Sequence, residues 1–352
     1  MFKKVIILSV SFALLMGFTA LPTFAKGDKV ELDLSLFIPE QHLRYQKVWK
    51  PWIERIKQES DGRLIITPYF ANALAPMPEN LEAVRSGIAD IGEYAMFTAP
   101  GRFPLTEVVM LPQLAGDKML DSHKATLIIN QLYEQYPQVR DEYKGVKLLS
   151  IHAAPVSIVS TTSKTINTLD DLKGVRLRTT GAKGAAIAKQ LGFTAVNLPM
   201  IDMYLSLERG VVDGAFIGAE LLVSRKWGEV LKRLVTNADF GVDAVMCMVM
   251  NPQSYDNLPA DLKKVIDNNS GRRLAELCGE TWAGFEQEAL MMAQKNMGLQ
   301  VNELPPEELA KLSKLMEPVK ADYVKFLNDK GLPGTAVFET ADKMAKELTA
   351  NQ

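Results

Sequence analysis

Two stretches of the chain resemble each other and predict its fold: LEAVRSGIADIG at residues 81–92 and YLSLERGVVDG at residues 204–214. In each, a Gly is followed three residues later by an Asp, as Gly87 by Asp90 and Gly210 by Asp213. The pattern is typical of an amphipathic helix, a left-handed Gly just past its end, and a short apolar strand that begins at the Asp. Two copies of this pattern predict two similar α/β lobes that hold a bound molecule between them. The alternative is chance, because Arg-x-Gly before a strand is common at such junctions.

The N-terminus has the features of a secretory signal peptide over residues 1–25. Lys3 and Lys4 form a basic start, residues 5–18 are apolar or small, and residues 23–25 offer a cleavage site. The apolar run is shorter than the ~20 residues that span a bilayer comfortably, and no Cys follows it to carry a lipid. We therefore expect a mature chain from about Lys26 in the periplasm. A cytoplasmic protein with an N-terminal anchor is the alternative.

Length and charge exclude some functions. The chain has 352 residues, which suggests two domains. Without Lys3 and Lys4, its 40 basic residues fall to 38 against 42 acidic ones, a net charge of about −4. Nucleic acid is not an expected partner, because binding it requires a basic surface. The two cysteines are Cys247 and Cys278; Cys247 lies in an apolar run, which favours a buried free thiol over a disulfide.

The order of apolar segments predicts an α/β fold with a ligand cleft between two lobes. The continuous apolar run 242–250 is typical of a central strand, and we expect it to cross back to the first lobe. Helical patterning without a Pro over about 259–296 predicts a long helix shared by both lobes. The expected division is 26–153 plus 242–285 for lobe I and 154–241 plus 286–352 for lobe II.

Motifs of catalysis are missing from the sequence. It has no Gly-x-Ser-x-Gly, His-Glu-x-x-His, Cys-x-x-Cys or phosphate-binding Gly-rich motif. Its three histidines, His42, His123 and His152, are too scattered to predict a metal site. We therefore expect neither an enzyme nor a cofactor or metal. His152, at the expected lobe junction, is interpreted as a structural histidine more readily than as a ligand contact.

Arg178 is the strongest candidate for a binding residue. In GVRLRTTG, residues 174–181, alternation places Arg176 and Arg178 on one face of a strand, with Arg178 at its carboxyl end. Ligands of open α/β sheets bind beyond those ends, and a guanidinium can donate two parallel hydrogen bonds to a carboxylate. Arg176 then serves as the solvated control. The alternative for Arg178 is a plain surface charge.

These motifs, as an ordered set, resemble a known family. KGVRLR at residues 173–178, Leu191-Gly192 with Pro199 downstream, YLSLERGVVDG at 204–214 and GIADIG at 87–92 are similar to the DctP-type solute-binding proteins of tripartite ATP-independent periplasmic (TRAP) transporters. The resemblance covers essentially the whole mature chain. It implies a periplasmic receptor, expected to be monomeric, with two lobes that close on an organic acid. The receptor delivers this acid to integral-membrane subunits driven by an ion gradient. The family's carboxylate-binding Arg falls on Arg178.

Two positions depart from the sialate-binding branch of that family. Val159 stands where that branch has a second Arg, and Ile217 stands where it has an Asn. Both changes favour a monocarboxylate with an apolar or aromatic body over a sialic acid. The alternative for each aromatic candidate is core packing. The candidate ligand-binding residues are Arg178, Phe216, Ile217, Glu220, Tyr94, Val159, Trp227, Phe37, His42 and His152.

The sequence thus favours a periplasmic receptor for an organic acid. A C4-dicarboxylate or another small organic acid remains an alternative ligand. A sensory protein that presents its ligand to a membrane kinase would have the same fold. An exported enzyme acting on small acids is disfavoured by the missing nucleophile and metal motifs.

Overall fold

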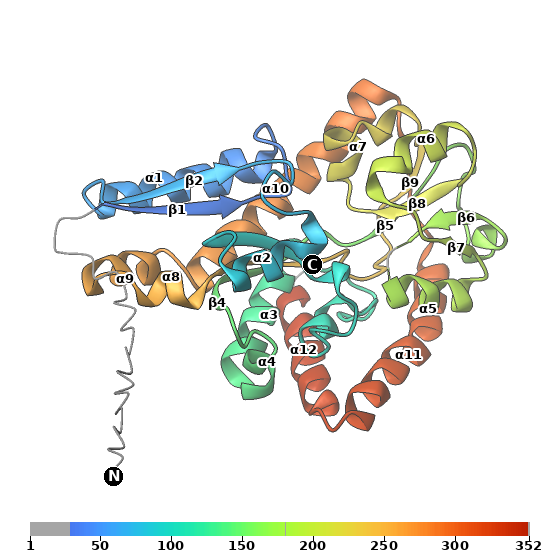
Figure 1. Cartoon of the computed structure of the whole chain (residues 1–352). Helices are drawn as coiled ribbons and strands as arrows, with labels where there is room; N and C mark the ends of the chain where they lie inside the picture. Colours follow the sequence, from blue (N-terminus) through green and yellow to red (C-terminus); the bar gives the residue numbers. More distant parts are fainter. Residues whose placement is uncertain (1–28, 180, 351–352) are drawn as a thin grey trace, which may run out of the picture.

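In residues 29–179 and 181–350, which the computed structural model describes, eleven strands form two separate sheets (Figure 1). The sheet of lobe I has the order β2-β1-β3-β10-β4, and that of lobe II has the order β11-β9-β5-β8-β6-β7. The strands of lobe I are β1 (Val30–Ser35), β2 (Leu64–Tyr69), β3 (Ile91–Ala95), β4 (Lys147–Ala153) and β10 (Val245–Met250). Those of lobe II are β5 (Ile158–Thr161), β6 (Arg176–Arg178), β7 (Thr194–Val196), β8 (Gly214–Ile217), β9 (Arg233–Val235) and β11 (Gln300–Asn302).

Helices cover both sheets and join them. Those that accompany lobe I are α1 (Lys50–Glu59), α2 (Asn80–Ser86), α3 (Ser122–Gln135), α4 (Pro137–Asp141), α8 (Pro252–Asp256), α9 (Ala260–Asn268) and α12 (Gly334–Thr349). Those of lobe II are α5 (Gly181–Leu191), α6 (Met203–Glu208) and α7 (Glu220–Ser224), while α10 (Arg272–Met297) and α11 (Pro306–Asp329) reach both lobes. The two-lobed α/β fold expected from the sequence is confirmed.

The repeated phrase forms the same hydrogen bonds in both lobes. Gly87 and Gly210 end their helices in the left-handed region, at φ of 80° and 67°. In lobe I, the Asp90 amide donates to the Asp33 carbonyl at 3.0 Å, and its carboxylate accepts from the Asp33 amide at 2.8 Å. In lobe II, Asp213 makes the same pair with Arg176, at 2.8 and 2.9 Å. Each Asp therefore clamps the strand that follows it, β3 or β8, to a neighbouring parallel strand.

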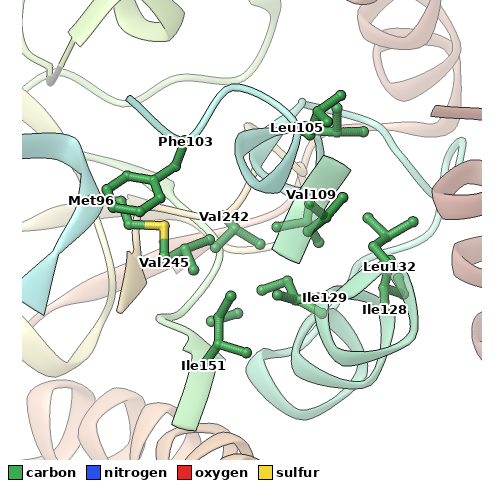
Figure 2. Packing of buried hydrophobic residues seen from close by; sticks show 14 of the residues in the cluster. Met96, Phe103, Leu105, Val109, Ile128, Ile129, Leu132, Ile151, Val242 and Val245 are labelled. Atoms are coloured by element: carbon green, nitrogen blue, oxygen red, sulfur yellow. The ribbon is translucent and has the colours of Figure 1, made fainter. Parts of the chain in front are cut away.

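Strand β10 brings the chain back to the first lobe, as the apolar run 242–250 predicted. It lies antiparallel between β3 and β4, with Met246 opposite both Ala95 and His152. All six of its residues are buried. Figure 2 shows how Val245, the first residue of β10, and Val242 in the segment before it pack with Ile151 of β4 and Val109 in the core of lobe I.

Two crossing segments join the lobes and are hydrogen-bonded to each other. The Ala154 amide donates to the Ala244 carbonyl and the Asp243 amide donates to the Pro155 carbonyl, each at 2.8 Å. An isolated antiparallel bridge joins Val156 to Val242 between them. The hinge is thus a short two-stranded ribbon rather than two independent linkers.

The long shared helix is shorter than the sequence predicted. The helical patterning over 259–296 divides into α9, which ends at Asn268, and α10, which begins after Gly271. Gly271 has a φ of 72°, a conformation that interrupts a helix. Helix α10 still serves both lobes, because it packs on α3 and β4 of lobe I and on α7 of lobe II (Figure 1).

The C-terminal helices modify the expected lobe division. Leu312 and Met316 of α11 lie in the core of lobe II, as the assignment of 286–352 to that lobe requires. Leu327 at the end of α11 and Val337 of α12 lie instead in the core of lobe I. Figure 1 shows α12 returning beside α3. Residues 334–349 therefore pack with lobe I, because the apolar face of α12 packs against α3. The order of the elements along the chain does not predict this pairing.

Three further expectations concern export and redox state. The predicted signal peptide, residues 1–25, lies outside the described residues. No described helix is both long and apolar enough to span a membrane. Cys247 and Cys278 are buried free thiols in two different core clusters, so the free-thiol interpretation of Cys247 is confirmed.

Replacing either repeat glycine with alanine should destabilise the protein. At a left-handed φ, the added methyl group of Gly87→Ala or Gly210→Ala should cost about 1–2 kcal/mol. Gly284→Ala is the matched control, because Gly284 lies exposed within α10 with no atom near its Cβ position. That change should stabilise by up to about 1 kcal/mol. Urea unfolding measures all three, and equal effects at the three sites would contradict the assigned role of the motif.

Candidate functional site

A cavity between the lobes lies beyond the carboxyl ends of strands from both sheets. It has a volume of about 310 Å³. Phe97, just after β3, and Gly101 line it from lobe I, and Lys183 lines it from the start of α5, just after β6. Open α/β sheets bind ligands at this end of their strands. The topology therefore directs both lobes toward one site.

Arg178 ends β6 and is almost completely buried, with 3% of its surface exposed. Its Nε donates weakly to the Leu198 carbonyl at 3.5 Å. Burial lowers the pKa of Arg178, and the negative charge of Asp243 opposes this shift. Among the described residues no carboxylate lies within ion-pair distance of the guanidinium. A buried cation in this state is suited to an anion supplied by a ligand.

Arg176, two residues earlier on the same strand, has a different role. Its guanidinium donates to both carboxylate oxygens of Asp213, at 3.0 and 2.6 Å, and 45% of its side chain is exposed. It therefore reinforces the clamp of the second repeat on the protein surface. Arg176 remains a suitable binding control, but it is an ion-paired residue and not a free surface charge.

An apolar wall on lobe I lies beside the hinge. It is a small cluster of Ala95, Ala154, Ala244, Met246 and Trp282, with the partly buried Phe37, Met77 and Phe97 packed against it. The three alanines lie at strand ends or in the crossing segments, and Phe97 of this set also lines the interlobe cavity. We refer to this set as the aromatic wall. Its rings are suited to packing against a flat apolar ligand.

A buried ion pair packs against two rings of the aromatic wall. Arg44 pairs with Glu93 through Nε at 2.6 Å and through Nη2 at 2.8 Å, and Trp49 donates to the same carboxylate at 3.2 Å. Burial raises the pKa of Glu93, while Arg44 and Trp49 oppose the rise. The Arg44 guanidinium lies 5.4 Å from the ring centre of Phe37 and 5.1 Å from that of Trp282. Its charge is thus already compensated, which makes it a positioning residue for the two rings.

The two predicted histidines lie next to this ion pair. His42 contacts the Trp282 ring edge at 6.4 Å between ring centres, and its Nδ1 accepts the Arg44 amide at 3.2 Å. His152 is fully buried beside Trp49, and neither of its ring nitrogens has a hydrogen-bond partner among the described residues. Burial, together with the charge of Arg44, lowers the pKa of each to about 3. Both are therefore neutral at physiological pH.

Two glutamates meet where α10 contacts lobe II. Glu286 of α10 accepts the backbone amides of Ala219 and Glu220, each at 2.8 Å. The residue is only partly buried, but its carboxylate lies against Gly218 and the start of α7. Burial raises the pKa of Glu286 to about 8, although the two amides oppose the rise. Glu220 is buried, its pKa is raised by burial, and it accepts the Ser224 hydroxyl at 2.6 Å.

Comparison with known proteins identifies the family. The model of the DctP family, described as bacterial extracellular solute-binding protein, family 7, matches residues 34–325. The chain belongs to the DctP family. A curated solute-binding protein of Verminephrobacter eiseniae is 27% identical over 217 residues, which are 61% of this chain and 63% of that relative. The match thus spans less than two thirds of the relative's length.

Solved structures of TRAP solute-binding proteins share the fold over nearly their whole length. One from a marine metagenome, specific for aromatic acid ligands and in complex with 3-hydroxybenzoate, is 29% identical with a TM-score of 0.83; 91% of this chain and 99% of that chain are covered. One from Bordetella bronchiseptica, with bound (R)- and (S)-mandelate, is 27% identical with a TM-score of 0.80 and the same coverage. One from Rhodoferax ferrireducens, with copurified benzoate, is 25% identical with a TM-score of 0.82 and covers 91% and 98%.

Membership of the DctP family agrees with the resemblance found in the sequence. The family and fold are those of solute-binding receptors, and the family is periplasmic. TRAP solute-binding proteins bind small organic acids and work with membrane subunits. Among the described residues, no group of three or more His, Cys, Asp or Glu could hold a metal ion.

Several predicted site residues of this DctP-family protein lie in cores instead of the cleft. Tyr94 is 1% exposed and packs with Phe103 in lobe I, and Trp227 is 1% exposed in lobe II. Val159 and Phe216 pair across β5 and β8 and face one core of lobe II. Ile217 faces the other core of that lobe. Because successive strand residues point to opposite faces, Val159 and Ile217 cannot form one continuous apolar pocket surface.

Other residues near the cleft were not predicted. Phe97, Trp282, Arg44, Glu286, Asp243 and Lys183 come from five different segments, with Trp282 and Glu286 both on α10, and their sequence contexts carry no binding motif. Trp282 is buried and packs in the aromatic wall. Lys183 follows Arg178 by five residues, which was the one signal available.

The stability of the protein should depend on the protonation of Glu286. Its folded-state pKa of about 8 lies above the ~4.3 of a free Glu, so the folded state binds the proton more tightly. This contribution to stability is present at low pH and is lost as the pH rises toward about 8. Glu286→Gln should therefore be relatively more stable, against wild type, at pH 9 than at pH 6.

Chemical denaturation at both pH values measures that difference. Glu288→Gln is the matched control, an exposed position on the same helix. Glu142 and Asp239, whose pKa values burial raises to about 7 and about 6, titrate in the same direction in every variant. The difference between wild type and Glu286→Gln therefore isolates Glu286, and a difference that does not change with pH would contradict the assignment.

Proposed function

We propose that this protein is a periplasmic receptor that captures an aromatic monocarboxylate and delivers it to the membrane subunits of a TRAP transporter. The observation that carries the proposal is the buried Arg178 at the end of β6, on the lobe opposite the aromatic wall. A guanidinium can hold a carboxylate through two hydrogen bonds, and stacked rings can hold its apolar body. The proposed receptor acts as a monomer and carries out no reaction.

The solved relatives support the aromatic ligand. Three of them, at 25–29% identity, hold 3-hydroxybenzoate, mandelate and benzoate. Each of these ligands joins one carboxylate to one aromatic ring. In this chain the aromatic wall supplies the apolar surface that the sequence had assigned to Val159 and Ile217.

The energetics of burial favour the same class. Burying a ring gains roughly 25 cal/mol per Å² of apolar area. A second carboxylate or a row of hydroxyls would lose its hydration against the apolar faces of these rings. The cation nearest the wall, Arg44, is already paired with Glu93. A dicarboxylate therefore fits less well than an aromatic monocarboxylate.

Arg178→Ala should abolish measurable binding of benzoate. Removing one side of a buried charge pair typically costs ~2–5 kcal/mol, because the other charge is left unpaired. Arg178→Lys should rescue only part of the affinity, since an ammonium lacks the planar fork. Arg176→Ala is the control and should bind nearly as the wild type does, although it loses the ion pair with Asp213. Calorimetry decides, and equal binding by the two Ala variants would overturn the role of Arg178.

The ligand class can be tested with the wild-type protein alone. In competition calorimetry, benzoate, 3-hydroxybenzoate and mandelate should bind more tightly than succinate, malate or a sialic acid. A ligand at 100 times its Kd should also raise the free energy of unfolding by ~2.7 kcal/mol. Tight succinate binding without any response to aromatic acids would refute the aromatic ligand and leave family membership intact.

A further inference from the structure

Lys183 is a second cation at the cleft, and no motif assigns it a role. It lies in the first turn of α5, where it lines the interlobe cavity. The apolar part of that cavity is formed by Phe97, Met110, Leu111, Ala186, Val319 and Phe326. An ammonium group is costly next to such a surface unless an anion or a carbonyl accepts its protons. The position of Lys183 therefore points to an acceptor for its protons at the cavity.

Lys183 and Asp243 line the same small cavity beside the hinge, together with Thr179, the residue after Arg178. The negative charge of Asp243 acts on the pKa of both cations and opposes the effect of burial on each. Asp243 belongs to the crossing segment, next to Ala244 of the aromatic wall. The two cations therefore approach Asp243 of the hinge from β6 and α5.

The protein itself uses only part of the hydrogen-bonding capacity of Lys183. Its Nζ donates to the Val242 carbonyl at 2.5 Å, within the hinge ribbon. An ammonium carries three donors, so two remain for other acceptors. The charged or titratable groups that face it are Asp239 and Asp243 of the crossing segment, Glu107 of lobe I, and Asp322 and Tyr323 of α11.

Those acidic groups do not neutralise the lysine by direct contact. Glu107 accepts the Tyr323 hydroxyl at 3.2 Å, and Asp239 accepts the Gly241 amide at 2.6 Å. Lys183 forms no ion pair with a described carboxylate within 4.0 Å. Its nearest acceptor is instead a neutral carbonyl. The ammonium is thus held at the cavity wall by the hinge and is oriented for an acceptor that enters the cavity.

We propose that Lys183 is a ligand-binding residue, which donates to the bound carboxylate alongside Arg178 while its bond to Val242 ties α5 to the hinge. This inference rests on the proposed function and assigns a second contact within that site. Burial lowers the pKa of Lys183 to about 8, so the contact should weaken as the pH rises above neutrality. Arginine at this position would keep its charge throughout that range.

The test measures benzoate binding by calorimetry at pH 7.0 for wild type and three variants. Lys183→Met keeps the unbranched shape of the side chain, one atom shorter, and removes its charge; the expected rise in Kd is about 10- to 100-fold, the usual worth of a hydrogen bond to a charged group. Lys183→Arg should lose less. Lys189→Met, exposed on the same helix, is the matched control and should bind as wild type does. Thermal unfolding without benzoate verifies that each variant is folded.

The pH dependence supplies a second readout. The wild-type Kd should rise as the pH increases from 7 to 9.5, and the Kd of Lys183→Arg should change less. A rise in Kd of the same size in both proteins would assign the titration to another group, such as Glu286, and would count against the proposal.

The outcomes distinguish the role of Lys183 from the proposed function. Lys183→Met binding within twofold of wild type, while Arg178→Ala loses binding, would overturn the role of Lys183 and leave the proposed function in place. No benzoate binding by the folded wild type would instead overturn the aromatic-acid receptor, and the role of Lys183 with it. A folded Lys183→Met with a 10-fold or larger loss supports both.

Discussion

The reciprocal hydrogen bonds of one aspartate in each lobe set the geometry of the whole protein. Asp90 binds both the amide and the carbonyl of Asp33, and Asp213 binds those of Arg176. Each aspartate fixes the strand after it, β3 or β8, at a defined height against its parallel neighbour. Strand register decides which residues reach the carboxyl end of a sheet. The clamp therefore sets where the carboxyl ends of these strands lie. Phe97 follows the end of β3, and Arg178 ends β6, which is held to β8.

The charges around the cleft differ in whether the protein itself neutralises them. Arg44 is paired with Glu93, and it supports Phe37 and Trp282 without being available to a second anion. Arg178 has no paired carboxylate among the described residues, and Asp243 influences it only at longer range. In a low-dielectric site this difference is large, because an unpaired buried charge is costly. Arg178 is thus a buried cation whose charge the described part of the protein does not neutralise by an ion pair.

Motion between the lobes is limited by the way the chain crosses. The two crossing segments are hydrogen-bonded to each other, α10 packs on both lobes, and α11 passes from the core of lobe II to that of lobe I. Such connections favour closure as a rotation of two rigid bodies about the hinge. Lys183, which lines the cavity, donates to the Val242 carbonyl of the hinge.

Sequence determined those features whose physical cause is local. A Gly in the left-handed region, an Asp three residues later, alternating strand residues and a helix-length apolar period predicted the two lobes and the position of Arg178 at a strand end. Tertiary structure alone decided the rest. It placed α12 on lobe I and put Val159 and Ile217 on opposite faces of one sheet. It also assembled the aromatic wall and brought Lys183 and Arg178 under the influence of the same carboxylate, that of Asp243. These contacts join residues far apart in the chain, and which apolar surfaces meet depends on the packing of complete elements and not on any one segment.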